Sequence, residues 1–220
     1  MLDKKQHYLQ IALNRSMGEV ERMVYLLPAS ERILLEAGTP FIKHYGQRGI
    51  SALRNWWSLK LGKLGYIVAD LKCMDRGATE VKLAAVAGAS AATCLGLAPV
   101  EAIEQFVLEC HSAGIDSMVD MMNVEFPFEV LGKLRNLPNI VVIHLGVDEA
   151  DNKEKEIPFH HIQRIKETYD IAVSVAGGET FKEAGQAIFN DADIAVVWRA
   201  FYDNPAKMAE LAKDFLREMK

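Results

Sequence analysis

Eight short apolar runs recur along the chain, and amphipathic stretches lie between most of them. The runs are residues 8–13, 33–36, 66–70, 89–95, 115–121, 140–145, 171–176 and 194–198. Amphipathic stretches occur at 79–87, 99–113, 126–134, 160–169, 180–189 and 205–219. Nearly continuous apolar runs of this length are typical of strands buried on both faces, which occur in parallel sheets covered by helices. The pattern therefore predicts strands alternating with helices around a parallel sheet.

Eight such units favour an α/β fold of the (β/α)8 TIM barrel type, in which the strands close into a ring inside a ring of helices. The length of 220 residues lies at the compact end of the range for that fold. A doubly wound open sheet is the alternative. No Pro/Gly/Ser-rich linker or low-complexity segment divides the sequence, so we expect residues 1–220 to form one domain.

The composition excludes several classes of partner. Half of the residues are hydrophobic, which is enough for one large core. The formal net charge of -5 and the pI near 5.7 lack the basic footprint of a nucleic-acid-binding protein. The longest run of small and apolar residues, 83–98, is too short and too interrupted by Gly, Ser and Thr to span a bilayer. We therefore expect a small-molecule substrate, with no nucleic acid and no membrane.

Cysteine usage and the N-terminal residues bear on the compartment. Cys73, Cys94 and Cys110 form no Cys-x-x-Cys pair and lie in apolar surroundings, which indicates reduced thiols. The first residues, Met-Leu-Asp-Lys-Lys-Gln-His-Tyr, lack the apolar core of a signal peptide. We expect a soluble, cytoplasmic protein.

Three ionisable residues follow the third apolar run in the sequence Asp70-Leu-Lys72-Cys-Met-Asp75. The period of two in a strand places Asp70 and Lys72 on the same face. Because unpaired buried charge is costly, this face must pair its charges or bind a ligand. A salt-bridged strand end without any chemistry satisfies the same pattern.

Polar residues also end most of the other predicted strands. In a barrel, the C-terminal ends of the strands form the mouth at which active sites lie. The residues concerned are Asn14, Glu36, Asp70, Lys72, Asp120, Asn123, His144, Gly177, Gly178, Trp198 and Arg199. Polar groups from so many strands are difficult to explain as packing, so the barrel mouth is the predicted site.

Six motifs from the first predicted strand to the last carry a resemblance to a known family. They are Leu-Gln-Ile-Ala-Leu-Asn at 9–14, Glu-Ala-Gly-Thr-Pro at 36–40, Ala-Asp-Leu-Lys-Cys-Met-Asp at 69–75, Val-Asp-Met-Met-Asn-Val at 119–124, Ile-His-Leu-Gly-Val-Asp at 143–148 and Val-Ala-Gly-Gly at 175–178. With them the chain resembles the orotidine monophosphate decarboxylase suprafamily, most closely its 3-hexulose-6-phosphate synthases, which are D-arabino-3-hexulose-6-phosphate formaldehyde-lyases.

The resemblance implies a homodimeric, Mg²⁺-dependent (β/α)8 aldehyde-lyase. Its reaction would be the aldol addition of formaldehyde to D-ribulose 5-phosphate, or the reverse cleavage, through an enediolate, with D-arabino-hex-3-ulose 6-phosphate as the product. Members outside the nucleotide decarboxylases share such an intermediate, and the 3-keto-L-gulonate-6-phosphate decarboxylases reach it by losing carbon dioxide.

The resemblance also implies roles for single residues. Glu36 and Asp70 match the metal carboxylates, and two carboxylates suffice because Mg²⁺ prefers oxygen ligands and keeps several waters. Lys72 would supply a cation beside the same substrate oxygens. His144 would move the proton at C1 of the substrate, a task suited to a group that titrates near neutrality. Asp120 would position His144, Lys72 or a substrate hydroxyl.

Asp75 matches an acid that crosses the dimer interface into the partner's site in this family. Each of these residues also has a plain interpretation without the resemblance. Asp75 is then a helix N-terminal acid, Glu36 a surface acid and His144 a hydrogen-bonded core residue. His160 and His161 open a predicted helix and are expected to be solvated.

Substrate binding is expected from Asn14 and from the loops after the last two strands, where barrels commonly bind phosphate. Gly177 and Gly178 let the backbone approach an oxyanion, and Arg199 can add bidentate charge-assisted hydrogen bonds. An ordinary strand-to-helix turn would also explain the two glycines.

Three positions depart from the family's pattern. Asn14 replaces the usual aspartate, so it can bind a substrate hydroxyl but cannot accept a proton. Trp198 replaces a glycine before the arginine. Val147 stands where the keto-gulonate decarboxylases have an arginine, which favours the formaldehyde-lyase. A decarboxylase of the 3-keto-L-gulonate-6-phosphate or orotidine-phosphate type remains an alternative, as does a sugar-phosphate-binding barrel without catalysis.

Overall fold

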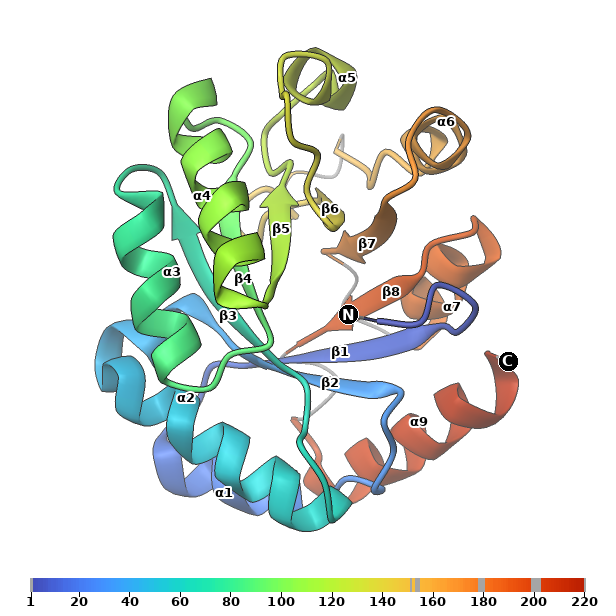
Figure 1. Cartoon of the computed structure of the whole chain (residues 1–220). Helices are drawn as coiled ribbons and strands as arrows, with labels where there is room; N and C mark the ends of the chain where they lie inside the picture. The colour runs from blue at the N-terminus through green and yellow to red at the C-terminus, as the bar shows by residue number, and fades with distance from the viewer. Residues whose placement is uncertain (1, 151, 153–154, 178–180, 199–202, 220) are drawn as a thin grey trace.

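The computed structural model describes residues 2–150, 152, 155–177, 181–198 and 203–219. Within these ranges eight parallel strands pair in chain order, and β8 pairs with β1 to close the ring (Figure 1). The strands are β1 Tyr8–Leu13, β2 Ile33–Ala37, β3 Ile67–Cys73, β4 Ala91–Leu95, β5 Asp116–Asp120, β6 Ile140–His144, β7 Ala172–Ala176 and β8 Ile194–Val197. The predicted (β/α)8 barrel is confirmed, and the alternative of an open sheet is wrong.

The helices surround the strands in Figure 1. They are α1 Met17–Leu26, α2 Thr39–Leu61, α3 Gly77–Val86, α4 Val100–Ala113, α5 Pro127–Leu131, α6 His160–Thr168, α7 Phe181–Phe189 and α9 Pro205–Glu218. Six of them coincide with the amphipathic stretches found in the sequence, and α1 and α2 occupy the first two intervals between strands. None of the described helices is long and apolar enough to cross a membrane.

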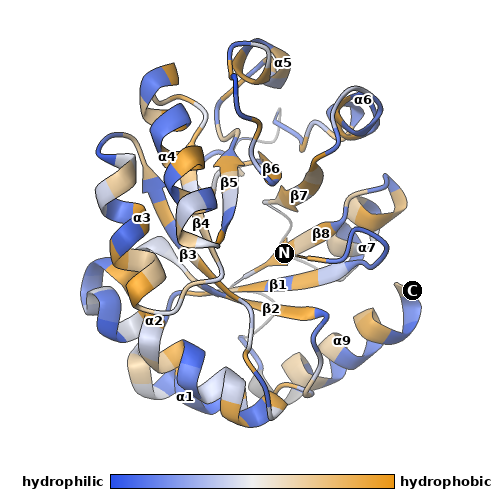
Figure 2. Cartoon of the chain, viewed as in Figure 1, coloured by the Kyte–Doolittle hydropathy of each residue, from blue (hydrophilic) through white to orange (hydrophobic). Residues whose placement is uncertain are grey.

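The core has two parts because each strand is covered on both faces. Outward-facing strand residues pack against the helices, where Trp57, Phe41, Phe106 and Phe215 are the largest fully buried side chains. Inward-facing residues fill the inside of the ring, and they are Tyr8, Leu34, Val68, Ala91, Met118, Ile140, Val142, Ala172, Ala176 and Ile194. The strands are accordingly mostly orange in Figure 2, whereas the helices carry blue outer faces. This double burial explains the continuous apolar runs in the sequence.

Two predictions about single side chains have different outcomes. Cys73, Cys94 and Cys110 are all buried and free, as predicted. The prediction that His161 is solvated is wrong, because its ring is buried and lies 6.5 Å from the Phe128 ring, centroid to centroid. Contact between α6 and α5, which the sequence pattern could not indicate, covers this residue.

Candidate active site

The C-terminal ends of the strands surround a cavity of about 590 Å³ to which all eight strands contribute. The polar or distinctive residues in its lining are Gln10, Asn14, Glu36, Thr39, Lys43, Asp70, Lys72, Thr93, Asp120, His144, Val147, Asp148, Gly177 and Trp198. This cavity is the barrel mouth at which the sequence placed the site.

A second cavity of about 580 Å³ lies at the opposite end of the barrel. Its buried acids are already paired, because Asp116 accepts a hydrogen bond from Tyr66 at 2.6 Å and Asp193 accepts one from Lys166 at 2.9 Å. Size does not distinguish the two cavities, but chemistry does. The buried acids at the lower end are held by protein donors, whereas the upper cavity retains polar groups that can meet a ligand.

Lys72 is the centre of the polar cluster in the upper cavity. Its Nζ lies 3.0 Å from Asp70 Oδ2 and 3.3 Å from Asp120 Oδ2. Burial alone would lower the pKa of this ammonium, but the charges of Asp70, Asp120 and Glu36 outweigh it and raise the pKa above its usual value. Lys72 therefore stays a cation, and it can donate hydrogen bonds to a developing oxyanion but cannot act as an amine nucleophile.

Lys72 reaches the cavity from an unusual backbone conformation. Its φ is 45°, in the left-handed region, which costs a non-glycine residue about 1–3 kcal/mol. The pairing of β3 with β4 is also irregular between Ala69 and Cys73. Asp70 and Lys72 do meet in the cavity as predicted, but an irregular strand end brings them together instead of the regular alternation.

Asp120 connects Lys72 to His144. The Nδ1 atom of His144 lies 2.8 Å from Asp120 Oδ2, and the Met122 N–H donates to Oδ1 at 2.9 Å. Burial alone would raise the pKa of Asp120, but the hydrogen bond and charge of His144, together with Lys72, lower it. Since the carboxylate is ionised, Nδ1 must donate to it, and a neutral ring then carries its lone pair on Nε2. His144 is thus oriented to act as a base through Nε2.

Asp70 is held by hydroxyl groups as well as by Lys72. Thr39, the first residue of α2, donates to Oδ2 at 2.7 Å, and Thr93 on β4 donates to Oδ1 at 2.8 Å. The carboxylate is 7% exposed, and neutral donors on both of its oxygens fix its plane. Asp70 is therefore oriented before any ligand enters.

Glu36 is another buried acid that lines the cavity, and it is 7% exposed. Burial, followed by the charge of Asp70, raises its pKa to about 7. Gln10 donates to Glu36 Oε2 at 2.5 Å. The amide oxygen of the same side chain, Gln10 Oε1, and Asn14 Oδ1 are buried without a hydrogen-bond partner in the described part of the chain. Several acceptor oxygens here thus still require a cation or a donor from a ligand.

The oxygen donors of this cavity bear on the predicted magnesium site. The described residues contain no group of three or more His, Cys, Asp and Glu side chains placed to hold a metal. Two buried carboxylates, Glu36 and Asp70, do line the same cavity beside buried acceptor oxygens. Hard oxygen donors, with room for water or substrate oxygens, suit Mg²⁺. The residues present therefore fit the ion through two carboxylates, with Mg²⁺ itself still a prediction.

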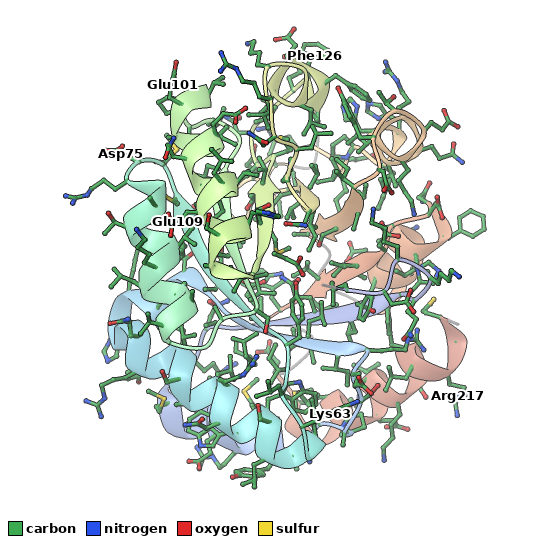
Figure 3. The ribbon with its side chains drawn as sticks, in the orientation of Figure 1. Lys63, Asp75, Glu101, Glu109, Phe126 and Arg217 are labelled. Carbon is green, nitrogen blue, oxygen red and sulfur yellow. The ribbon has the colours of Figure 1, made fainter. Side chains whose placement is uncertain are left out.

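The remaining predicted residues are more scattered. Asn14 and Gly177 line the cavity with Trp198, but Asn123 does not. Asp75 is exposed and lies outside the cavity, and in Figure 3 it is at the outer edge of the molecule beside the start of α3. Gly178 and Arg199 lie outside the described residues.

Glycine is required at position 177 because the backbone of Leu145 comes too close for a side chain. Its φ is 113°, and a Cβ atom there would lie 2.6 Å from the carbonyl oxygen of Leu145. The absent side chain therefore makes room for the end of β6. This packing reason for the glycine stands beside the predicted role in phosphate binding.

Gln10, Thr39 and Thr93 are polar residues of the cavity for which the sequence predicted no role. Gln10 and Thr93 are single polar residues at inward-facing positions of otherwise apolar strands. A buried polar side chain in such a run requires a partner inside the barrel, and this was the available signal. The partner itself could not be identified without the strand register.

Comparisons with known proteins agree with this geometry. The family model described as "Orotidine 5'-phosphate decarboxylase / HUMPS family" matches residues 7–214. A relative named "Bifunctional enzyme Fae/Hps" from Methanocella arvoryzae is 37% identical over 217 residues, which cover 97% of this chain and 53% of the relative. One with the same name from Archaeoglobus fulgidus is 38% identical over 197 residues, covering 88% and 48%. The chain thus spans about half the length of the curated relatives that it matches.

Solved structures share the fold. A 3-hexulose-6-phosphate synthase from Salmonella typhimurium has a TM-score of 0.84 at 24% identity, covering 97% of this chain and all of that one. A second 3-hexulose-6-phosphate synthase structure has a TM-score of 0.77 at 26% identity, covering 94% and 98%. KGPDC from Streptococcus mutans has a TM-score of 0.75 at 22% identity, covering 97% and 99%. The barrel is therefore common to enzymes with different names.

The lowered pKa of Asp120 predicts a pH-dependent contribution to stability. A carboxyl whose pKa is lower in the folded state stabilises the fold above its unfolded pKa of about 4, and this stabilisation is lost as the pH falls through the folded value. Asp120→Asn should lower the free energy of unfolding by roughly 2–4 kcal/mol at pH 7. The deficit should shrink below about pH 4.

Urea unfolding of wild type and Asp120→Asn at several pH values measures this difference. Asp214→Asn is the control, because Asp214 forms an ion pair with Arg217 on the surface helix α9. The control should change stability by less than about 0.5 kcal/mol at either pH. A deficit for Asp120→Asn that does not vary with pH would contradict the assignment of an ionised, stabilising carboxylate.

Proposed function

Because the chain belongs to the orotidine 5'-phosphate decarboxylase / HUMPS family, we propose that it is an aldehyde-lyase of the 3-hexulose-6-phosphate synthase type. It joins formaldehyde to D-ribulose 5-phosphate and forms D-arabino-hex-3-ulose 6-phosphate. The relatives named Fae/Hps and the two synthase structures support this choice. Val147, which lines the cavity where the keto-gulonate decarboxylases place an arginine, favours the lyase over the decarboxylase.

The continuous array of Lys72, Asp120 and His144 is the observation that carries the proposal. Aldol chemistry at C1 requires a base for the C1 proton and a fixed positive charge near the C2 oxygen. His144 Nε2 supplies the base, and the Lys72 ammonium supplies the charge. One carboxylate, that of Asp120, orients both groups, so the base and the cation are held in one geometry.

His144 and Lys72 together account for the proton transfers and the developing charge in this reaction. His144 takes the C1 proton of ribulose 5-phosphate, and the C1–H electron pair moves into the enediolate. That pair then forms the new bond from C1 to the formaldehyde carbon, and the formaldehyde oxygen takes the proton back from His144. Lys72 remains protonated throughout and stabilises the negative charge on the C2 oxygen.

Glu36 and Asp70 would hold Mg²⁺, which when bound would polarise the substrate carbonyl and stabilise charge on the enediolate oxygens. Thr39 and Thr93 keep Asp70 in place for this task. Asn14 would bind a substrate hydroxyl through its unpartnered Oδ1. Gly177, Gly178 and Arg199 would bind the phosphate. The three free, buried cysteines agree with the proposed cytoplasmic location.

We expect the purified protein to consume formaldehyde and D-ribulose 5-phosphate together when Mg²⁺ is present, and to stop when a chelator is added. Lys72→Ala should lower kcat by roughly 10²–10³-fold, since it removes a preorganised donor to the oxyanion. The measurement is the loss of formaldehyde and the appearance of the hexulose phosphate.

Absence of formaldehyde consumption by the wild type would refute the synthase. Release of carbon dioxide from a 3-keto sugar-acid phosphate would instead identify a decarboxylase. Binding of ribulose 5-phosphate without turnover of either substrate would identify a non-catalytic barrel. Activity retained in Lys72→Ala would remove Lys72 from the mechanism.

We also propose a homodimer in which Asp75 enters the partner's cavity. Met74, next to Asp75, and Leu83 and Val86 on the following helix α3 are apolar side chains that a second copy could cover, since they are 44%, 50% and 83% exposed. Lys72→Ala and Asp75→Asn should each be inactive alone. In a mixed dimer, one cavity combines Lys72 of one chain with Asp75 of the other.

Mixing the two variants after reversible dissociation should therefore restore about a quarter of the wild-type activity, because half of the dimers are mixed and each has one complete site. Size-exclusion chromatography with light scattering checks the dimer itself. If the mixture stays as inactive as its components, Asp75 does not act across the interface.

A further inference from the structure

Strand β4 has one inward-facing hydroxyl, that of Thr93. It lies opposite the irregular end of β3, where Lys72 has its left-handed backbone conformation. Ala69 pairs with Ala92, and Cys73 pairs with Cys94, so β3 advances four residues while β4 advances two. Asp70 and Lys72 both lie in this interval. Regular backbone pairing is interrupted where the two charged residues enter the cavity.

The Thr93 hydroxyl bonds to both residues of this interval. The Lys72 N–H donates to Thr93 Oγ1 at 3.1 Å, and Thr93 Oγ1 lies 2.8 Å from Asp70 Oδ1. A hydroxyl has one hydrogen. A backbone N–H can only donate a hydrogen bond, and a carboxylate can only accept one. Thr93 therefore accepts from the Lys72 backbone and donates to the Asp70 carboxylate at the same time. Thr93 is 5% exposed, and it lines the cavity.

We propose that Thr93 is a positioning residue, whose hydroxyl holds the left-handed backbone at Lys72 and the plane of the Asp70 carboxylate in one fixed arrangement. Its catalytic consequence rests on the proposed function, because Lys72 and Asp70 are the groups that meet the substrate there. Thr93 acts through these two residues and takes no chemical part in the reaction.

A comparison with Thr39 shows what is particular to Thr93. The Thr39 hydroxyl has one hydrogen and two acceptors within reach, the other carboxylate oxygen of Asp70 at 2.7 Å and the Asp70 carbonyl oxygen at 3.0 Å. Within the described part of the chain, that hydroxyl makes no hydrogen bond to Lys72, whereas Thr93 accepts one from the Lys72 backbone N–H. Among the hydrogen bonds of the described residues, Thr93 thus joins the conformation of the lysine to that of the acid.

Thr93→Val keeps the shape of the side chain and removes the hydroxyl, and Thr93→Ser keeps the hydroxyl and removes a methyl group. In the ligand-free protein, amide hydrogen exchange at Lys72 should become at least about tenfold faster in Thr93→Val, because its acceptor is gone. The amides of Val68, Ala69 and Leu95 should keep wild-type exchange rates. Thr93→Ser should retain the protection at Lys72.

In the synthase assay, Thr93→Val should lower kcat by roughly 30- to 100-fold, since a displacement of about 1 Å at reacting groups has effects of this size. The KM for ribulose 5-phosphate should change by less than about threefold, because the substitution removes no contact that Thr93 is proposed to make with the bound substrate. Thr93→Ser should restore kcat to within about threefold of the wild type. If Thr93→Val does not fold, Thr93→Ala against Thr93→Ser gives the same comparison.

Unchanged exchange at Lys72 in Thr93→Val would overturn the proposal. So would a general loss of protection along β3 and β4, which would show a merely structural role. If the wild type has no synthase activity, the proposed function fails, but the exchange data still decide whether Thr93 positions Lys72.

Discussion

The ammonium of Lys72 between the carboxylates of Asp70 and Asp120 is the interaction on which the rest of the barrel mouth depends. Buried carboxylates cannot stay ionised side by side without a compensating charge. Glu36 illustrates this limit, because burial and the charge of Asp70 raise its pKa to about 7. The hydrogen bond and charge of His144, with the cation at Lys72, lower the pKa of Asp120, and an ionised Asp120 in turn accepts a hydrogen bond from Nδ1 of His144. The charge of Lys72 thus affects the neighbouring acids on both sides of it.

Barrel closure brings these groups together. Asp70 and Lys72 come from β3 and Asp120 from β5, and β4 lies between them in the ring. Inward-facing residues of alternate strands share a layer in this fold, so side chains far apart in sequence meet above the apolar filling of the ring. Thr93 on the intervening strand then supports the irregular end of β3. Lys72 on β3 thus contacts both Thr93 on β4 and Asp120 on β5, so the cluster spans three neighbouring strands.

The sequence predicted the fold well for a physical reason. Strands buried on both faces must be apolar throughout, so the runs at 8–13 and 171–176 correspond closely to β1 and β7. The barrel mouth was also predictable, because polar side chains lie at the ends of the apolar runs, as His144 does near the end of the run at 140–145. Thr93 was not predictable, since its role depends on an irregular pairing that no local pattern records. His161 was misjudged because its burial depends on how α6 packs against α5.

Exchange of the C1 hydrogen of D-ribulose 5-phosphate with deuterated water, followed by proton NMR without formaldehyde, tests the central claim most directly. It isolates the proton transfer assigned to His144 beside the Lys72 cation. We expect the wild-type protein with Mg²⁺ to exchange this hydrogen, and His144→Ala and Lys72→Ala not to exchange it. Absence of exchange in the wild type, or undiminished exchange in either variant, would contradict it.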